Sequence, residues 1–291
     1  MPTLLDFRRR IRSVKNTQQM TRAMKFVAAA RLRRAQERAL AARPYALQMA
    51  RVLRSTMGRI ENPVHPLFAR RPEEKLLVLV ITGERGLCGA FNANVLRLAG
   101  DFFRQHEGKR ILALPIGKKG RDALRKQGWE SAAEYTNVLA RVEFEDARRI
   151  ATQVIGLYTA ARVDAVYVVF SEFKSVLVPR LTVEKLLPIE AIGSQEETAA
   201  EAATAQVDYI YEQPAETLLD RLLPRYVETH VYRVMLESSA AEHAARMAAM
   251  ESATQNAGDV IQQLTLHMNK VRQAAITKEI IEVVSGAAST A

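Results

Sequence analysis

Two long stretches of the chain, one at each end, carry apolar residues in a helical repeat. Between Ala28 and Leu53, apolar or small residues recur at alternating steps of three and four, and between Leu236 and Ala275 this alternation continues without a break. A period of 3.5 residues is typical of the seam of a coiled coil. The larger side chains that we place on the seam are Leu32, Leu53, Leu236, Met247, Met250, Ile261, Leu264, Met268 and Val271.

The N-terminal repeat is less regular towards the start of the chain. Continued backwards, the alternation places Lys25 and Gln18 on the seam, whereas Met20, Met24 and Val27 form a competing apolar stripe. Charged and amide side chains are unusual on such a seam. We therefore expect the packed face of this helix to rotate in the region of the competing stripe.

The middle of the chain has a different pattern, typical of alternating strands and helices. A continuous apolar run, LLVLVIT, reads as a strand buried on both faces, and a glycine-rich turn and a helical stretch to about residue 106 follow it. We predict strands at 76–82, 110–117, 164–173, 175–189 and 207–212, with a short helix at 117–128 and a hairpin formed by 164–173 and 175–189. This order indicates an α/β sheet of the Rossmann-like type.

These patterns divide the chain into three parts. We expect an N-terminal coiled-coil helix at 1–58, a central α/β domain at 59–213 with a mobile acidic loop at 191–206, and a C-terminal coiled-coil helix at 214–291. Pro44 should bend the first helix or weaken one of its hydrogen bonds. The predicted fold is therefore α/β, in which the N- and C-terminal helices pair as a long antiparallel coiled coil beside the central domain.

The positive charge of the protein is concentrated in the first helix. The chain has a formal net charge of +10. Residues 1–59 hold 15 Lys and Arg against two acidic residues, a balance of +13, whereas the remainder holds 27 basic and 30 acidic residues, a balance of −3. Such a segment predicts an acidic partner, which the charge alone leaves open as nucleic acid, anionic lipid or a carboxylate-rich protein surface.

Composition excludes several classes of protein. With 48% hydrophobic and 25% charged residues the chain is globular, and its one cysteine, Cys88, allows neither an internal disulfide nor a cysteine-rich zinc site. No run of about 18 apolar residues is present, so we expect no membrane span. The N-terminus resembles neither a secretory signal nor a transit peptide, and the expected compartment is the reducing cytoplasm.

No catalytic constellation is recognisable in the sequence. The turn GERGLCG at 83–89 stands between a strand and a helix but matches neither phosphate-binding glycine motif, so we interpret it as a structural turn. His243 lies on the seam without a second ligand at metal-binding spacing, and Cys88 has no histidine nearby in sequence. The alternative to a protein-contact function is a basic coiled-coil protein that binds nucleic acid, although its N-terminal helix offers few aromatic residues for stacking.

The two ends of the chain, together with segments between them, carry a family resemblance. The start contains Ser13-Val14, Asn16-Thr17 and Ala23-Met24-Lys25, and the end reads Ile276-Thr277-Lys278-Glu279, followed by Ser285-Gly286-Ala287-Ala288. Between them stand ITGERGLCGAFNANV at 81–95 and YIYEQPAETLLDRLLPRYVETHVY at 209–232. In these motifs and their order, the chain closely resembles the gamma subunits of F-type ATP synthases.

The resemblance implies a function without chemistry of its own. Gamma subunits form a central shaft that couples proton-driven rotation of a membrane ring to the conformational cycle of the catalytic subunits, and hence to ATP synthesis or hydrolysis. The implied partners are three alpha and three beta subunits, an epsilon subunit and the c-subunit ring, with one shaft in each complex. It implies no cofactor, metal, nucleotide or nucleic acid, and a peripheral place at the cytoplasmic face of a bacterial cell membrane.

Residue by residue, the resemblance also implies contact sites. Contacts with the beta subunit are expected at Met24, Lys25, Arg272, Gln273, Thr277 and Glu279. Contacts with the membrane ring are expected at Tyr209, Tyr211 and Glu212.

Overall fold

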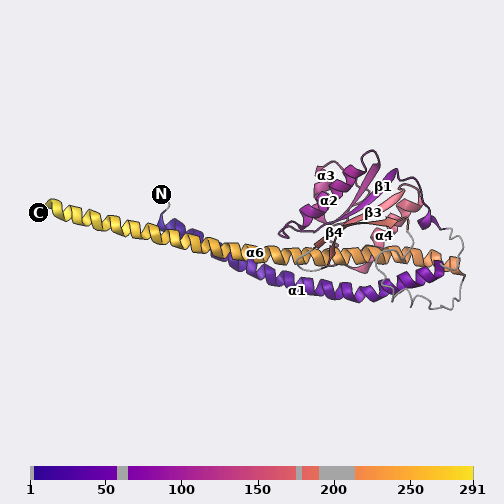
Figure 1. Cartoon of the computed structure of the whole chain (residues 1–291), viewed down its shortest axis with the longest axis horizontal. Coiled ribbons are helices and arrows are strands. Elements are labelled where there is room, and N and C mark those ends of the chain that lie inside the picture. Colours follow the sequence, from indigo (N-terminus) through magenta and orange to yellow (C-terminus); the bar gives the residue numbers. More distant parts are fainter. Residues whose placement is uncertain (1–2, 58–64, 175–178, 190–213, 291) are drawn as a thin grey trace. The chain divides into compact units, whose positions relative to one another are not determined.

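The computed structural model describes residues 3–57, 65–174, 179–189 and 214–290 (Figure 1). Its helices are α1 (Leu4–Met57), the 3₁₀-helix η1 (Pro66–Phe68), α2 (Phe91–Gln105), α3 (Lys118–Lys126), α4 (Phe144–Thr159) and α6 (Ala215–Thr290). Its strands are β1 (Lys75–Ile81), β2 (Arg110–Ile116), β3 (Ala165–Phe173) and β4 (Pro179–Leu187). The predicted strand at 207–212 and the loop at 191–206 lie outside the described residues.

The chain divides into two compact units. Unit 1 comprises residues 1–29 and 246–291, and unit 2 comprises residues 30–245. The terminal helices predicted from the heptad pattern are both present, and α1 continues through Pro44 without interruption. Every residue assigned to the seam, from position 28 to 53 and from 236 to 275, is buried or half-buried.

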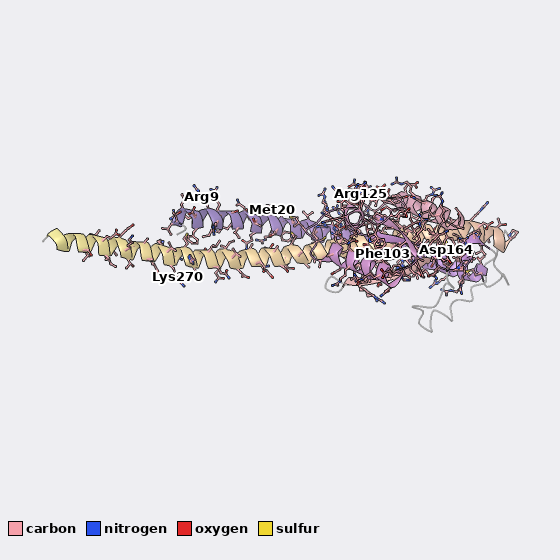
Figure 2. All side chains as sticks on the ribbon, turned by 90° about the horizontal axis from the view of Figure 1, so that it is seen from above. Arg9, Met20, Phe103, Arg125, Asp164 and Lys270 are labelled. Carbon is pink, nitrogen blue, oxygen red and sulfur yellow. The ribbon has the colours of Figure 1, made fainter. Side chains whose placement is uncertain are left out.

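Unit 1 is an antiparallel pair of helices. The ring of Phe7 lies 5.1 Å from that of His267, and the side chain of Lys25 reaches Glu251. Partners on α6 therefore come earlier in the sequence as α1 proceeds, as an antiparallel pair requires. Figure 2 shows the two helices side by side, with Arg9 and Met20 on α1 and Lys270 on α6.

The expected rotation of the packed face of α1 is wrong. Met20 is 60% exposed and Val27 is 53% exposed, whereas Gln18 and Lys25 are half-buried at the positions that the alternation assigns to the seam. The heptad register continues unchanged, because the polar residues on it find polar partners on α6. Met20 and Val27 of the competing stripe are left on the outer surface, whereas Met24 is half-buried.

Unit 2 contains a four-stranded sheet in the order β2-β1-β3-β4. Strand β1 is parallel to both β2 and β3, and β3 and β4 form the predicted antiparallel hairpin, in which Val169 pairs with Val183. The chain crosses first outward to β2 and then back over β1 to β3, which places connecting helices on both faces of the sheet. This doubly wound order is the Rossmann-like arrangement expected from the sequence.

Successive residues of β1 point into two separate cores. Leu76, Val78 and Val80 pack with α2 and α3, whereas Leu77, Leu79 and Ile81 pack with α4 and with the first half of α6. All six side chains are fully buried. The run is continuously apolar because both faces of the central strand are covered.

Helix α4 was not anticipated from the sequence. Its buried residues, Ala147, Ile150, Ala151, Val154 and Tyr158, recur at the three-four spacing of an amphipathic helix. Glu145 and Asp146 lie in its first turn, where negative charge favours the helix dipole. It lies between the short helix predicted at 117–128 and the strand predicted at 164–173.

Candidate interface on the helix pair

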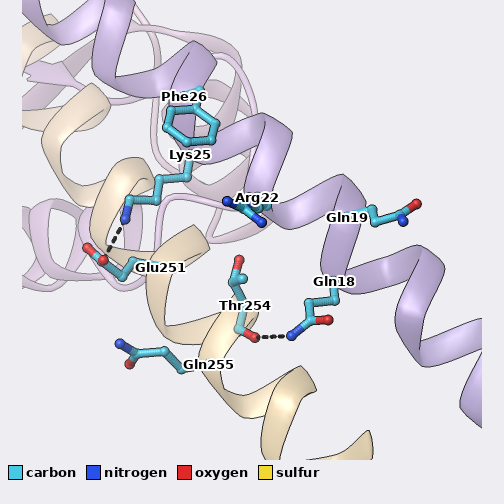
Figure 3. Close-up of a pocket in the computed structure, with 8 residues that line it drawn as sticks. All are labelled: Gln18, Gln19, Arg22, Lys25, Phe26, Glu251, Thr254 and Gln255. Carbon is cyan, nitrogen blue, oxygen red and sulfur yellow. Dashed lines mark hydrogen bonds and ion pairs between the residues drawn. The ribbon is translucent and has the colours of Figure 1, made fainter.

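Unit 1 contains a layer of polar side chains where its seam would otherwise be apolar. Five residues form it, Gln18, Thr21 and Lys25 from α1 and Glu251 and Thr254 from α6, and we call them the polar layer. All five are half-buried. The heptad positions of α1 bring its three members to one face of the helix, and α6 supplies a complementary partner for each of them. Figure 3 shows the contacts of Gln18 and Lys25 with Thr254 and Glu251.

The first contact in the polar layer is an ion pair. The Lys25 ammonium lies 2.5 Å from a carboxylate oxygen of Glu251, and the two side chains are 32% and 47% exposed. A pair with this exposure contributes modestly to stability, because water screens it. Its geometry nevertheless ties one position of α1 to one position of α6.

The other contacts are hydrogen bonds between uncharged groups. The amide of Gln18 donates to the backbone carbonyl of Thr254 over 3.3 Å, and the hydroxyls of Thr21 and Thr254 are 2.8 Å apart. Thr21 also lies 3.0 Å from the carbonyl of Gln18, and Thr254 lies 2.7 Å from that of Met250. In either proton arrangement, therefore, one hydroxyl donates across the seam while the other donates to its own helix.

A shallow cleft of about 330 Å³ opens beside the polar layer. Its lining comes from both helices and consists of Gln18, Gln19, Arg22, Lys25, Phe26, Glu251, Thr254 and Gln255. Phe26 is 61% exposed, and Arg22 is also exposed. The cleft thus presents positive charge and one apolar ring, as a surface that meets another protein does.

The C-terminal part of α6 presents a second surface. Arg272, Gln273, Thr277 and Glu279, expected at a partner contact, are all exposed, and the Thr277 hydroxyl donates to the backbone carbonyl of Gln273 over 2.9 Å. In Figure 1, α6 extends beyond the N-terminal end of α1. Ala275, the last residue assigned to the seam, is half-buried, and residues 276–285 are all exposed.

Large apolar side chains are exposed on the same extension. Their exposed fractions run from 49% at Ile276 to 72% at Val283. Ile280, Ile281 and Val284 complete the set. Several such residues within nine positions form an apolar surface of a kind that marks contact with another protein.

Met24 and Lys25, the remaining expected contacts in unit 1, differ in their surroundings. Lys25 is engaged within the chain by Glu251, and Met24 beside it is half-buried. Tyr209, Tyr211 and Glu212, expected at the membrane ring, lie outside the described residues.

The glycine-rich turn in unit 2 packs against the protein itself. At the carboxyl ends of parallel strands, where a doubly wound fold usually binds its ligand, Cys88 and Phe91 cluster with Phe173 and Ala241. The Gly83 amide donates to Asn92 over 2.8 Å, and a Cβ at Gly83 would come within 2.8 Å of the Glu242 carboxylate. This close packing supports the interpretation of the turn as structural.

The backbone amides at the N-terminus of helix α3 likewise donate hydrogen bonds to side chains of this chain. The Lys118 amide donates to the carboxylate of Glu84 over 3.1 Å, and the Gly120 amide donates to the hydroxyl of Thr82 over 2.7 Å. Gly117 has a φ of 108°, and a Cβ there would lie 2.0 Å from the Thr82 carbonyl oxygen. Side chains of this chain therefore occupy amides at a helix N-terminus, the kind of position where anions bind in other proteins.

A half-buried ionic network joins β4 to α6 in unit 2, and the sequence analysis missed it. Arg233 lies 2.8 Å from Glu184 and 3.1 Å from Glu237, and the His230 imidazole lies 3.2 Å from Glu184. Spacing of three and four along α6 aligns His230, Arg233 and Glu237 on one face. Only the partner strand could have revealed their role, and it is distant in sequence.

Burial and charge shift the ionisation of this network in defined directions. Burial lowers the pKa of His230 and outweighs the hydrogen bond with Glu184. For Glu184, burial acts to raise the pKa, but His230 and Arg233 outweigh it and lower the pKa. Burial raises the pKa of Glu237 despite the charge of Arg233.

Neither a metal site nor a membrane-spanning helix is found in the described ranges. Within them, no group of three or more His, Cys, Asp or Glu side chains is placed to hold a metal ion. Among the helices that these ranges contain, none has the length and apolar character needed to cross a membrane.

Comparison with known proteins gives a consistent set of relatives. The family model described as ATP synthase matches residues 3–290. Similar sequences include the ATP synthase gamma chains of Solibacter usitatus, 50% identical over 99% of both chains, and of Chlorobium phaeobacteroides, 47% identical over 99% of this chain and 98% of that protein.

Solved structures resemble the chain in fold. One is the mitochondrial ATP synthase central stalk and c-ring of Tetrahymena thermophila, with 26% identity, a TM-score of 0.59, and coverage of 80% of this chain and 99% of that one. Another is the Euglena gracilis mitochondrial ATP synthase, with 19% identity, a TM-score of 0.68, and coverage of 99% and 94%. The second likeness bears on the fold alone.

Proposed function

This chain belongs to the ATP synthase gamma family, and we propose that it couples rotation of a membrane ring to ATP synthesis or hydrolysis in the catalytic subunits. Full-length identity of 50% to a gamma chain is the observation that carries the proposal. In this role the chain transmits twist and contributes no catalytic group of its own. Coupling of this kind is reciprocal, so hydrolysis in the catalytic subunits would turn the same shaft in reverse.

The proposed contact with the catalytic subunits lies on the exposed end of α6. The polar groups of this contact come from Arg272, Gln273, Thr277 and Glu279. The exposed apolar residues between Ile276 and Val284 would be removed from water by contact with another protein. Met24 and Lys25 belong to the proposed contact at the level of the polar layer. The positive balance of residues 1–59 fits a carboxylate-rich partner surface, because arginine pairs well with carboxylates.

The proposed assembly has a single copy of this chain with three alpha and three beta subunits, an epsilon subunit and a c-subunit ring. The solved relatives support this direction, since one is a central stalk with a c-ring and another is an F1 with a c-ring. Tyr209, Tyr211 and Glu212 are proposed to meet the ring. The protein would then lie peripherally at the cytoplasmic face of a bacterial cell membrane.

Proton pumping in inverted membrane vesicles tests the proposed function. Vesicles from cells that lack this chain should neither acidify on addition of ATP nor make ATP from a proton gradient, and restoring the chain should recover both activities. Equal ATP-driven acidification with and without the chain, at equal amounts of assembled catalytic subunits, would contradict the proposal.

A further inference from the structure

Within unit 1, the polar layer interrupts a seam that is otherwise made of small and apolar residues. On α1, Ile11 and Val14 precede it and Ala28 follows it, and on α6 it lies between Met247 and Ile261. Polar side chains at such positions pack less favourably than apolar ones, because part of their hydration is lost. Stability alone therefore gives no reason for five of them to face one another.

A displacement of the two helices by one heptad shows how the polar layer distinguishes the observed register from a shifted one. It would place Thr21 opposite Met247 or Ile261 in place of Thr254, and Lys25 would lose Glu251. The ammonium would then lose its ion pair, and the Thr21 hydroxyl would face an apolar side chain and keep only the Gln18 carbonyl of its own helix, which is less favourable in a half-buried position. The surrounding apolar layers, by contrast, would still meet apolar layers, and they discriminate weakly between registers.

We propose that the polar layer fixes the register of the antiparallel helices in unit 1. Single polar residues on the seams of other coiled coils set register in the same way, at a cost in stability. Here three contacts across the seam act together, two of them hydrogen bonds and one an ion pair. Gln18, Thr21, Lys25, Glu251 and Thr254 are thus positioning residues.

A glycine in the interior of α6 supports this assignment independently. A Cβ at Gly258 would lie 3.2 Å from the amide nitrogen of Gln18, closer than ordinary contact. Glycine weakens a helix interior, since alanine there is more favourable. The space that Gly258 leaves is the space in which Gln18 reaches the Thr254 carbonyl.

The use of a fixed register in rotation rests on the proposed function, whereas the register itself does not. A helix pair whose helices slipped along each other would transmit rotation less efficiently. A seam rich in alanine and methionine offers little resistance to such slip. The polar layer supplies that resistance near the cleft where both helices are accessible.

Disulfide trapping in assembled membrane complexes tests the register directly. Phe7→Cys combined with His267→Cys reports the native register, and Phe7→Cys combined with Val260→Cys or Ala274→Cys reports displacement by one heptad in either direction. Each pair is introduced into the otherwise unchanged chain and into a chain whose polar layer is apolar (Q18L, T21V, K25L, E251L and T254V). Cys88 is 1% exposed, so it should not interfere.

The expected result is a native-register disulfide alone in the unchanged chain, and a rise of roughly tenfold in shifted disulfides in the apolar chain. Exclusively native disulfides in the apolar chain would overturn the proposal. The single substitution Lys25→Glu should raise the shifted products, and its combination with Glu251→Lys should remove them again. Failure of that restoration would also overturn it. Arg33→Met, which removes an ion pair within one helix, is the matched control.

Gly258→Ala gives a second measurement, which does not depend on cross-linking. In the unchanged chain the gain in helix propensity should be offset by displacement of Gln18, so the melting temperature should hardly rise. In a Gln18→Ala background the same substitution should raise it by roughly 2–4 °C. Equal rises in both backgrounds would contradict a role for the Gln18 contact. Neither measurement depends on ATP synthesis, so they can fail while the proposed function holds.

Discussion

At the scale of single residues, the half-buried imidazole of His230 makes the stability of unit 2 depend on pH. Its pKa is lowered from 6.5 by burial, so unfolding takes up a proton when the pH falls below that value. The stability it supports is complete above about pH 6.5 and is lost as the pH falls towards the folded-state pKa. Glu184 acts in the same direction at lower pH, whereas Glu237, with its raised pKa, acts in the opposite direction.

We therefore predict that His230→Gln flattens the acid side of the stability profile. Urea unfolding of the wild type should show a loss of stability between about pH 7 and pH 5.5, and the variant should lose less over the same interval. The glutamine keeps a donor for Glu184 while it removes the titrating group. Parallel profiles for the two proteins would show that His230 does not control this interval.

Leu264 tests the seam in unit 1 at the same scale. Leu264→Lys places a charge at a half-buried seam position and should destabilise the helix pair by roughly 1–3 kcal/mol, measured by thermal unfolding. Gln263→Lys, one residue away and exposed, is the control and should change stability by less than about 0.5 kcal/mol. A larger effect at the control position would contradict the assigned register.

At the scale of elements, Pro44 is a local defect in α1. It lies in the helix interior, exposed, and cannot donate a hydrogen bond to the carbonyl of Leu40. Pro44→Ala should restore that bond and raise the stability of the full chain by roughly 1–3 kcal/mol, as followed by circular dichroism on heating. An unchanged or lowered melting temperature would indicate that the proline serves a packing role.

The elements that the sequence predicted well are those whose signal is local. The seam follows from the spacing of residues such as Leu32 and Leu264, and β1 follows from an uninterrupted apolar run. Helix α4 was not predicted, although Ile150 and Val154 carry a regular helical spacing. This helix completes the cover on one face of the sheet.

The predictions that were wrong or missing concern contacts between residues that are far apart in the sequence. Gln18 and Lys25 looked like errors in the seam because their partners, Thr254 and Glu251, are more than 200 positions away. The network around Arg233 could not be predicted for the same reason, since its partner Glu184 lies on a strand that is distant in sequence. A polar residue on an apolar face can be recognised in a sequence, but its partner has to be found in the fold.

At the scale of the whole molecule, the exposed end of α6 carries the proposed contact with the catalytic subunits. Gln273→Leu and Thr277→Val should each lower ATP-driven proton pumping about fivefold, the equivalent of one hydrogen bond of about 1 kcal/mol. Because both residues are exposed, the melting temperature of the isolated chain should stay unchanged. Thr277→Ser keeps the hydroxyl and should retain pumping. Normal pumping in both apolar variants would remove these residues from the contact.

Observation of single complexes tests the central claim most directly. Arg125 is exposed on α3, so Arg125→Cys can carry a visible probe, while the catalytic subunits are fixed to a surface and Cys88 stays buried. Our account predicts that ATP drives continuous rotation of the probe in one direction, and that rotation stops when ATP is withdrawn. Sustained ATP hydrolysis by complexes whose probe stays still would contradict it.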